Sequence, residues 1–140
     1  MTYRRLVWAC VICAFCCAML MGCGGEAVIQ ITMVGVYNGT VIGDGAGPIR
    51  FYVGPGGHLT GNLIVAPLCN QPIHVTGTVD PSGKVRFTGT GCGCTYTFRG
   101  KIERLAPGSN VFVGSGTWKG CGTRGTWSVT WVARTGSISV

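Results

Sequence analysis

Short runs of alternating apolar and polar residues recur along most of this chain, and each run is bounded by a cluster of Gly, Pro, Asn or Asp. A period of two residues is typical of a strand that buries one face, and the bounding clusters favour tight turns. Beyond residue 23 no segment has the period of an amphipathic helix. The sequence therefore predicts an all-β domain.

About eight strands are expected in this domain. The first runs from about Ala27 to Ile42, with an interruption near Gly35. The other seven are expected at Ile49–Val53, His58–Val65, Ile73–Val79, Lys84–Thr90, Thr95–Glu103, Val111–Trp118 and Gly125–Arg134. The clearest turn between them is Asp80-Pro81-Ser82-Gly83, which has proline in its second position.

Turns this short join antiparallel neighbours, so the simplest topology is an up-and-down meander. Eight such strands can close into a small barrel, which removes exposed sheet edges, and a β-sandwich is the alternative. The steps Gly116-Thr117-Trp118 and Gly125-Thr126-Trp127 resemble those of calycin-type barrels, avidin-like proteins in particular. The resemblance implies a barrel fold, and no ligand site of that group maps onto this chain residue by residue.

The strand alternation places the aromatic residues on one face. Trp127, Val129 and Trp131 share a side of the last strand, and Gly116 and Trp118 share a side of the strand before it. If Trp118 pairs with Trp127, then Gly116 faces Val129, and a small residue makes room for a large one. We interpret the Trp and Phe residues as barrel core, with a ligand-stacking surface as the alternative.

Four basic residues are expected on the outside of two neighbouring strands. Lys84 and Arg86 alternate with apolar residues in the fifth strand, and Arg99 and Lys101 do so in the sixth. They predict a patch for an anionic partner, with a solvated barrel wall as the plainer interpretation. Lys84 is expected opposite Arg99, a like-charge pair that needs an anion or water nearby.

The N-terminus has the layout of a secretory signal, in which Arg4 and Arg5 precede an apolar run from Leu6 to Met21. The run contains 16 residues, whereas a membrane-spanning helix needs roughly 20. It therefore predicts a helical signal peptide that is cleaved. An ordinary secretory peptide or a membrane helix is the alternative, and the paired arginines leave twin-arginine export open.

At the end of this run, Leu20-Met21-Gly22-Cys23 resembles the lipobox of bacterial lipoproteins. The resemblance implies that residues 1–22 are removed and that Cys23 becomes the first mature residue. It also implies that Cys23 carries a diacylglyceryl group and that its new amino group is acylated, with chains such as palmitate. Two or more chains on one residue make a durable membrane anchor.

Residues 23–140 are expected to form a single domain after a short tether, since their number suffices for one core. Nine basic and four acidic residues give this part a net charge of about +5. The partners expected of a basic exported domain are the membrane, anionic envelope components or another envelope protein, and not nucleic acid. Gly24 is not the aspartate that resembles an inner-membrane retention signal, which favours the outer membrane of a Gram-negative cell.

Four further cysteines, Cys69, Cys92, Cys94 and Cys121, lie between predicted strands. In a meander the loops that carry them emerge at one end, so the four thiols should gather at one rim. An even number in an exported domain predicts two disulfides. A direct Cys92–Cys94 bridge would strain so short a loop, so Cys69 and Cys121 should each bond to one of these two. Zinc or Cu(I) on four thiolates is one alternative, and free or redox-active thiols are another, but no metal is predicted.

Catalytic patterns are lacking from the sequence of the mature part. Its carboxylates do not pair, and His58 and His74 are isolated in strand-like sequence. Gly43-Asp44-Gly45-Ala46-Gly47 is not followed by a predicted helix, so it is not a phosphate loop. No enzyme and no cofactor are predicted.

We expect a binding or structural module of the cell envelope. The alternatives are a calycin-like small-molecule carrier, which needs an open interior, and a periplasmic protein inhibitor, which needs a rigid protruding loop.

Overall fold

The computed structural model describes residues 33–134. The expected signal peptide, the acylated Cys23 and the part of the first predicted strand that precedes residue 33 lie outside the described residues. Within residues 33–134, no helix is long and apolar enough to cross a membrane.

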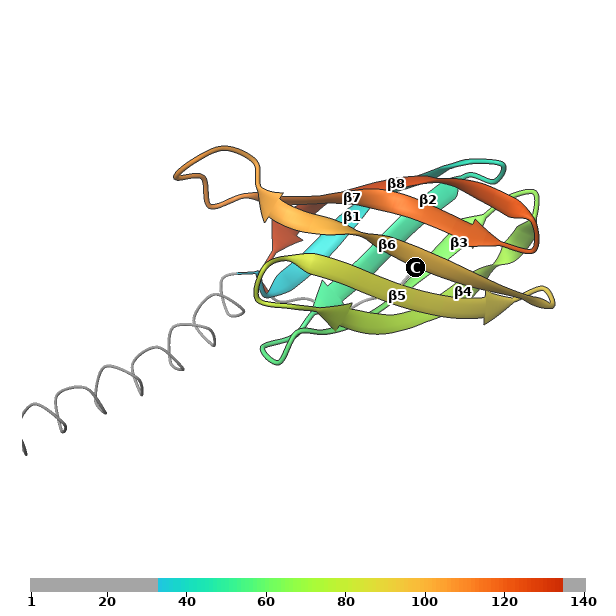
Figure 1. Ribbon diagram of the computed structural model, residues 1–140, viewed down its shortest axis with the longest axis horizontal. Helices are drawn as coiled ribbons and strands as arrows, with labels where there is room; N and C mark the ends of the chain where they lie inside the picture. Colours follow the sequence, from blue (N-terminus) through green and yellow to red (C-terminus); the bar gives the residue numbers. More distant parts are fainter. Residues whose placement is uncertain (1–32, 135–140) are drawn as a thin grey trace, which may run out of the picture.

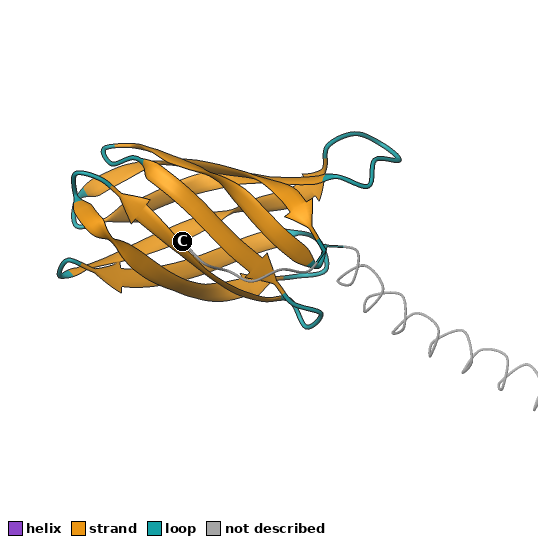
Figure 2. Ribbon diagram, turned by 180° about the vertical axis from the view of Figure 1, so that it is seen from behind, coloured by secondary structure: helices purple, strands orange, loops and turns teal. Residues whose placement is uncertain are grey.

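Eight antiparallel strands form a closed barrel, in which each strand pairs with the next and β8 pairs with β1 (Figures 1 and 2). The strands are β1 (Gly35–Gly43), β2 (Gly47–Val53), β3 (His58–Val65), β4 (Cys69–Val79), β5 (Lys84–Gly91), β6 (Cys94–Arg104), β7 (Phe112–Gly120) and β8 (Thr123–Ala133). The predicted all-β meander is confirmed, and it closes as a barrel rather than a sandwich. Closure leaves no unpaired sheet edge.

Aromatic side chains fill the barrel interior. Six rings form a chain of contacts, in which the centroids of consecutive rings are between 4.6 and 6.4 Å apart. Their order is Tyr37, Phe51, Phe87, Phe98, Trp118 and Tyr96. All six are at most 1 % exposed, and so is Trp127, which packs edge-on against Phe87. The interpretation of these residues as core is confirmed.

The tryptophans also satisfy their polar atoms inside the protein. The indole N–H of Trp118 donates to the carbonyl oxygen of Ile42 at 3.0 Å, which lies across the barrel seam on β1. Trp127 donates to Arg99 at 3.2 Å and Trp131 to Val34 at 3.2 Å, again to carbonyl oxygens. Each of these three indole N–H groups therefore has a partner.

The predicted pairing of Trp118 with Trp127 is wrong by two residues. Trp118 pairs with Gly125, and Trp127 pairs with Gly116. The reason is the β7–β8 turn, which contains only Cys121 and Gly122 between the paired residues Gly120 and Thr123. Trp118 and Trp127 therefore each face a glycine rather than each other, and a large residue again lies opposite a small one.

The barrel has two distinct ends. Residue 33, the start of β1 and the end of β8 lie at one, together with the β2–β3, β4–β5 and β6–β7 connections, and we name it the N-terminal end. At the other end, which we name the disulfide end, lie the β1–β2, β3–β4, β5–β6 and β7–β8 connections. The β6–β7 connection projects from the N-terminal end (Figure 1).

Candidate binding wall and disulfide-tied rim

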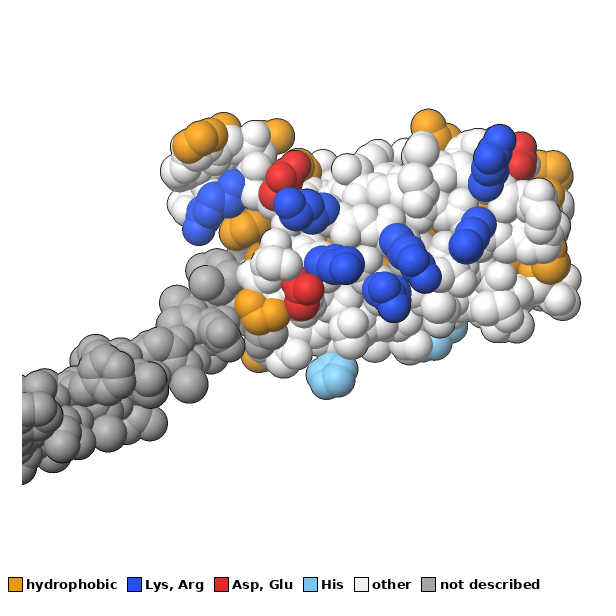
Figure 3. All heavy atoms as spheres, in the orientation of Figure 1, with side chains coloured by type: hydrophobic (Ala, Val, Ile, Leu, Met, Phe, Trp, Pro, Cys, Tyr) orange, Lys and Arg blue, Asp and Glu red, His pale blue; other side chains and the backbone are white. Residues whose placement is uncertain are grey.

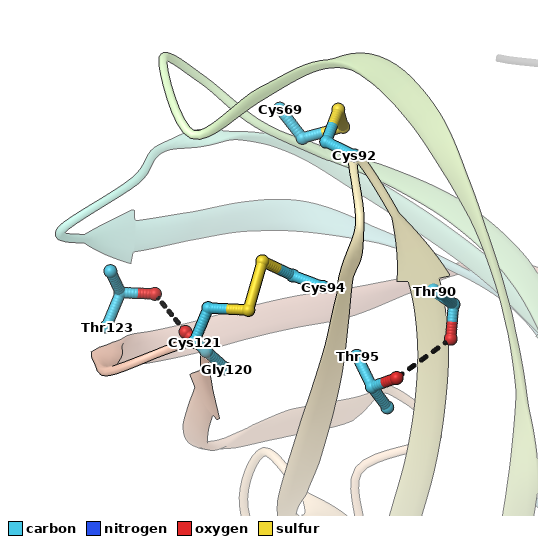
Figure 4. Close-up of a disulfide and its surroundings, with 8 residues drawn as sticks. All are labelled: Cys69, Thr90, Cys92, Cys94, Thr95, Gly120, Cys121 and Thr123. Atoms are coloured by element: carbon cyan, nitrogen blue, oxygen red, sulfur yellow. Dashed lines mark hydrogen bonds between the residues drawn. A yellow bond between two sulfur atoms is a disulfide. The ribbon is translucent and has the colours of Figure 1, made fainter.

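Two disulfides hold the rim of the disulfide end. Cys69 at the start of β4 bonds to Cys92 in the β5–β6 turn, and Cys94 at the start of β6 bonds to Cys121 in the β7–β8 turn (Figure 4). Their Cα atoms are 5.7 and 5.8 Å apart. The predicted gathering at one rim is confirmed, and so is the bonding of Cys69 and Cys121 to one each of Cys92 and Cys94. These four sulfurs are therefore not thiolate ligands for a metal, and residues 33–134 hold no cluster of His, Cys, Asp and Glu that could bind one.

The β5–β6 and β7–β8 turns share the sequence Gly-Cys-Gly. Each has a cysteine and then a glycine as its two central residues, with φ of 52° and 78° in the first turn and 49° and 75° in the second. Two positive φ values in a row define the two-residue turn that matches strand twist. Residues other than glycine seldom adopt a positive φ. These turns could not be recognised from the sequence, because cysteine replaces the usual asparagine or aspartate.

Threonines and an aspartate add hydrogen bonds at the same rim. The hydroxyl groups of Thr90 and Thr95 are 3.1 Å apart beside the first turn, and the Thr123 hydroxyl donates to the Gly120 carbonyl in the second (Figure 4). Asp44 forms two hydrogen bonds with the backbone of Arg124. The Asp44 N–H donates to the Arg124 carbonyl oxygen at 3.0 Å, and the Asp44 carboxylate accepts from the Arg124 N–H at 2.9 Å. The rim is therefore held on both sides of the β8–β1 seam.

The four predicted basic residues lie together on the outside of β5 and β6. Lys84, Arg86, Arg99 and Lys101 are all exposed, as their alternation predicts. The expected pairing of Lys84 with Arg99 is wrong, because the turn contains only two residues. Lys84 instead faces Lys101, and Arg86 faces Arg99. Two like-charge pairs therefore lie side by side.

Two basic residues that the sequence analysis did not assign to the patch continue it onto the next hairpin. Lys119 on β7 and Arg124 on β8 are exposed and face each other directly, which makes a third like-charge pair. Figure 3 shows basic side chains gathered on this face of the molecule. We name the following six residues the basic wall: Lys84, Arg86, Arg99, Lys101, Lys119 and Arg124. By contrast, β1 to β4 together contain a single Lys or Arg, Arg50.

Of the three carboxylates among residues 33–134, Asp80 and Asp44 accept hydrogen bonds from groups other than the side chains of the wall, and Glu103 is exposed on β6 beyond Lys101. Asp80 accepts from the Ser82 hydroxyl at 2.6 Å and from the backbone N–H groups of Ser82 and Lys84 at 3.0 and 2.9 Å. These bonds, that of the Ser82 hydroxyl first, hold the pKa of Asp80 below its usual value. Asp44 accepts from a backbone N–H. The side-chain hydrogen bonds formed between residues 33 and 134 involve none of the six basic side chains of the wall.

A groove lies in the wall over β6, β7 and β8. One hollow of about 360 Å³ is lined by Thr97, Arg99, Thr117, Trp118, Lys119, Arg124 and Gly125. A second, of about 440 Å³, shares three of these residues and continues to the Cys121 turn. Volumes of this size are typical of sites for small molecules or single groups of larger ones. The groove therefore offers three cations and two threonine hydroxyl groups to one ligand.

The histidines do not form a site with these residues. His58 and His74 are exposed on β3 and β4, where their cross-strand neighbours are Thr78 and Asn62. Neither neighbour is a carboxylate that could orient an imidazole, and the side-chain hydrogen bonds of residues 33–134 involve neither histidine. The wall, by contrast, gathers cations on one side of the barrel, where they can bind an anion.

No protein-family model matches this chain, and no curated protein matches it. The resemblances to bacterial lipoproteins and to calycin-type barrels rest on the residues quoted for them. The function must therefore be inferred from the fold and from the chemistry of the surface.

Proposed function

We propose that this protein is a non-enzymatic binding module of a bacterial cell envelope, anchored to the outer membrane by acyl chains on Cys23, which binds an anionic envelope component through the basic wall. The observation that supports the binding is the set of three like-charge pairs on one side of the barrel. Like charges placed directly opposite each other destabilise a sheet. An anion bound between them removes this repulsion.

The position of the anchor is compatible with an accessible wall. Nine residues lie between Cys23 and Met33, and the ten steps from one to the other reach at most about 35 Å in an extended chain. It joins the barrel at the N-terminal end, whereas the groove lies toward the disulfide end. A protein held in this way keeps the groove free for a partner in the envelope.

The filled interior argues against the small-molecule carrier. A carrier of the calycin kind needs an open barrel, and here the interior is occupied by aromatic rings in mutual contact. The outer surface is therefore the place where a ligand binds in this proposal.

A protein inhibitor is a second candidate, which the projecting β6–β7 connection supports. Leu105 is 62 % exposed there. Two hydrogen bonds hold the connection, one from the Leu105 N–H to the Val111 carbonyl and one from the Arg104 guanidinium to the Ser109 carbonyl. The Arg104 guanidinium also stacks on Phe112, with its Cζ atom 5.0 Å from the ring centroid. Inhibition of a peptidase that Leu105→Asp abolishes would support this candidate, and no inhibition across a panel of envelope and secreted peptidases would reject it.

Binding to the envelope tests the leading proposal. The lipidated protein, purified in a neutral detergent, is mixed with envelope fragments from cells that lack it, and the bound fraction is measured by sedimentation. We expect binding that weakens as salt is raised, because salt screens exposed charges. We also expect Lys84→Gln/Lys101→Gln to bind more weakly than the wild type.

The matched control is Arg104→Gln/Arg134→Gln, which removes the same charge away from the wall. It should bind nearly as well as the wild type. Binding that is indifferent to salt, or that falls equally in both variants, would contradict a specific role for the basic wall.

A further inference from the structure

We infer that the ligand of the basic wall is a linear acidic polysaccharide, which lies along the wall and places one acidic group in the groove between Arg99, Lys119 and Arg124. The inference rests on the function proposed above and specifies its ligand. It is carried by the shape of the wall, by the side chains between its cations and by the geometry of the groove.

The wall is a diagonal stripe rather than a compact cluster. Lys84 and Lys101 are paired across β5 and β6, whereas Lys119 and Arg124 lie in register with Thr97, which is four residues before Lys101 on β6. The stripe crosses the four strands β5 to β8. With about 3.3 Å per residue and about 4.8 Å per strand, its two ends are roughly 20 Å apart. One phosphate or one lipid headgroup cannot contact both ends, but an extended polymer with repeated charges can.

The side chains between the cations carry hydroxyl groups. From the level of Lys101 to the disulfide end, every outward position of β5 to β8 is Lys, Arg, Thr or Ser. Hydroxyl groups both donate and accept hydrogen bonds, as the hydroxyl groups of a sugar do. The surface is thus complementary to a chain that alternates charged groups with alcohols.

The same composition disfavours two other polyanions. Proteins that bind a membrane surface insert apolar side chains between the headgroups, and the large exposed apolar residues Ile42, Leu105 and Val132 all lie off this part of the wall. Proteins that bind single-stranded nucleic acid stack its bases on aromatic side chains. No outward position in the stretch described above is aromatic.

The groove provides the strongest single contact. Lys119 and Arg124 face each other across β7 and β8, and Arg99 lies beside the same hollow. An acidic group in the hollow can contact all three cations while Thr97 and Thr117 bond to the adjoining sugar. Charge-assisted hydrogen bonds of this kind are about twice as strong as neutral ones.

The test uses the lipidated protein in phosphatidylcholine vesicles and fluorescent dextran sulfate and polygalacturonate as probes, with neutral dextran for comparison. We expect both acidic polymers to bind and neutral dextran not to bind. A long dextran sulfate should bind more tightly than a short one or glucose sulfate, because only the long chain spans the stripe. Lys119→Gln/Arg124→Gln should weaken binding roughly tenfold or more, whereas Arg104→Gln/Arg134→Gln should change it less than about twofold.

The inference is overturned if glucose sulfate binds as tightly as the long polymer, or if the two double variants lose affinity equally. It is also overturned if phosphatidylglycerol vesicles or a DNA oligonucleotide displace dextran sulfate at a lower concentration of charge than polygalacturonate does. If dextran sulfate fails to bind while envelope fragments still bind through the wall, the polysaccharide is wrong and the proposed function stands. If the wall variants leave binding to envelope fragments unchanged, the proposed function itself fails.

Discussion

Asp80 organises the turn that leads into the basic wall. Its carboxylate accepts from the hydroxyl and N–H groups of Ser82 and from the N–H of Lys84, the first residue of β5 and of the wall. The four-residue pattern at this turn was recognisable in the sequence, because aspartate followed by proline favours it. The structure adds that the pKa of Asp80 is lowered by the same hydrogen bonds.

Replacement of Asp80 by alanine should change how stability depends on pH. Because the folded-state pKa lies below the unfolded value, the hydrogen bonds stabilise the fold above the unfolded pKa of about 3.9, and this stabilisation is lost as pH falls through the folded-state value. We expect Asp80→Ala to lose roughly 1 kcal/mol at pH 7 and less in acid. Urea unfolding at both pH values measures this. A loss that is equal in neutral and acidic solution would contradict it.

Gly125 is a second residue whose role follows from one contact. A Cβ atom at this position would lie 2.5 Å from Nε1 of Trp118 and 2.0 Å from the carbonyl oxygen of Ile42. These two atoms form the hydrogen bond that spans the β8–β1 seam. Gly125→Ala should therefore lower the free energy of unfolding by roughly 1–3 kcal/mol, as overpacking does.

The control for this substitution is Gly54→Ala, where the nearest atom to a new Cβ is 3.7 Å away. It should shift thermal unfolding much less than Gly125→Ala. Equal shifts would show that the indole contact is not the cause.

The hairpins of β5–β6 and β7–β8 carry both the wall and the disulfides. The disulfides close segments of 23 and 27 residues in sequence separation, which corresponds to roughly 3–4 kcal/mol each in the chain-entropy account. Cys69→Ser/Cys92→Ser and Cys94→Ser/Cys121→Ser should each lower the free energy of unfolding by about 2–4 kcal/mol. Reduction of both disulfides in the wild type should lower the free energy of unfolding by more than either double variant does. A variant as stable as the oxidised wild type would contradict a stabilising role for the disulfide that it lacks.

The same hairpins mark where prediction from the sequence ended. The alternation correctly placed Lys84 and Arg86 outside, because the faces of a strand do not depend on its partner. The partners themselves depend on turn length, and cysteine hid the two-residue turns. The expected register was off by two residues, an even number that preserves the faces and changes only which residues pair. Lys119 and Arg124 were not assigned to the patch for the same reason, because their pairing follows from the second turn.

The whole molecule is asymmetric in charge and occupied inside. Almost all basic residues of the strands lie on β5 to β8. Three of the four disulfide-bonded cysteines also lie in this half of the barrel, and the fourth, Cys69, begins β4. Aromatic side chains occupy the interior of the barrel, so the proposed ligand is placed on its outer surface. Eight alternating strands sufficed to predict an all-β meander, but a sandwich accepts the same alternation, and the pairing of β1 with β8 that closes the barrel comes from the structure. The groove depends on the registers of three strands and could not be predicted from composition.

Intact mass of the protein purified from its native membrane, before and after reduction, tests the anchored and disulfide-tied barrel most directly. We predict a chain that begins at Cys23, carries the mass of its acyl chains and gains about 4 Da on reduction of the two disulfides. Cys23→Ser, as a control, should leave the mass of residues 1–22 in place and add no acyl chain. A wild-type chain without acyl groups that begins elsewhere, or one whose mass does not change on reduction, would contradict the account.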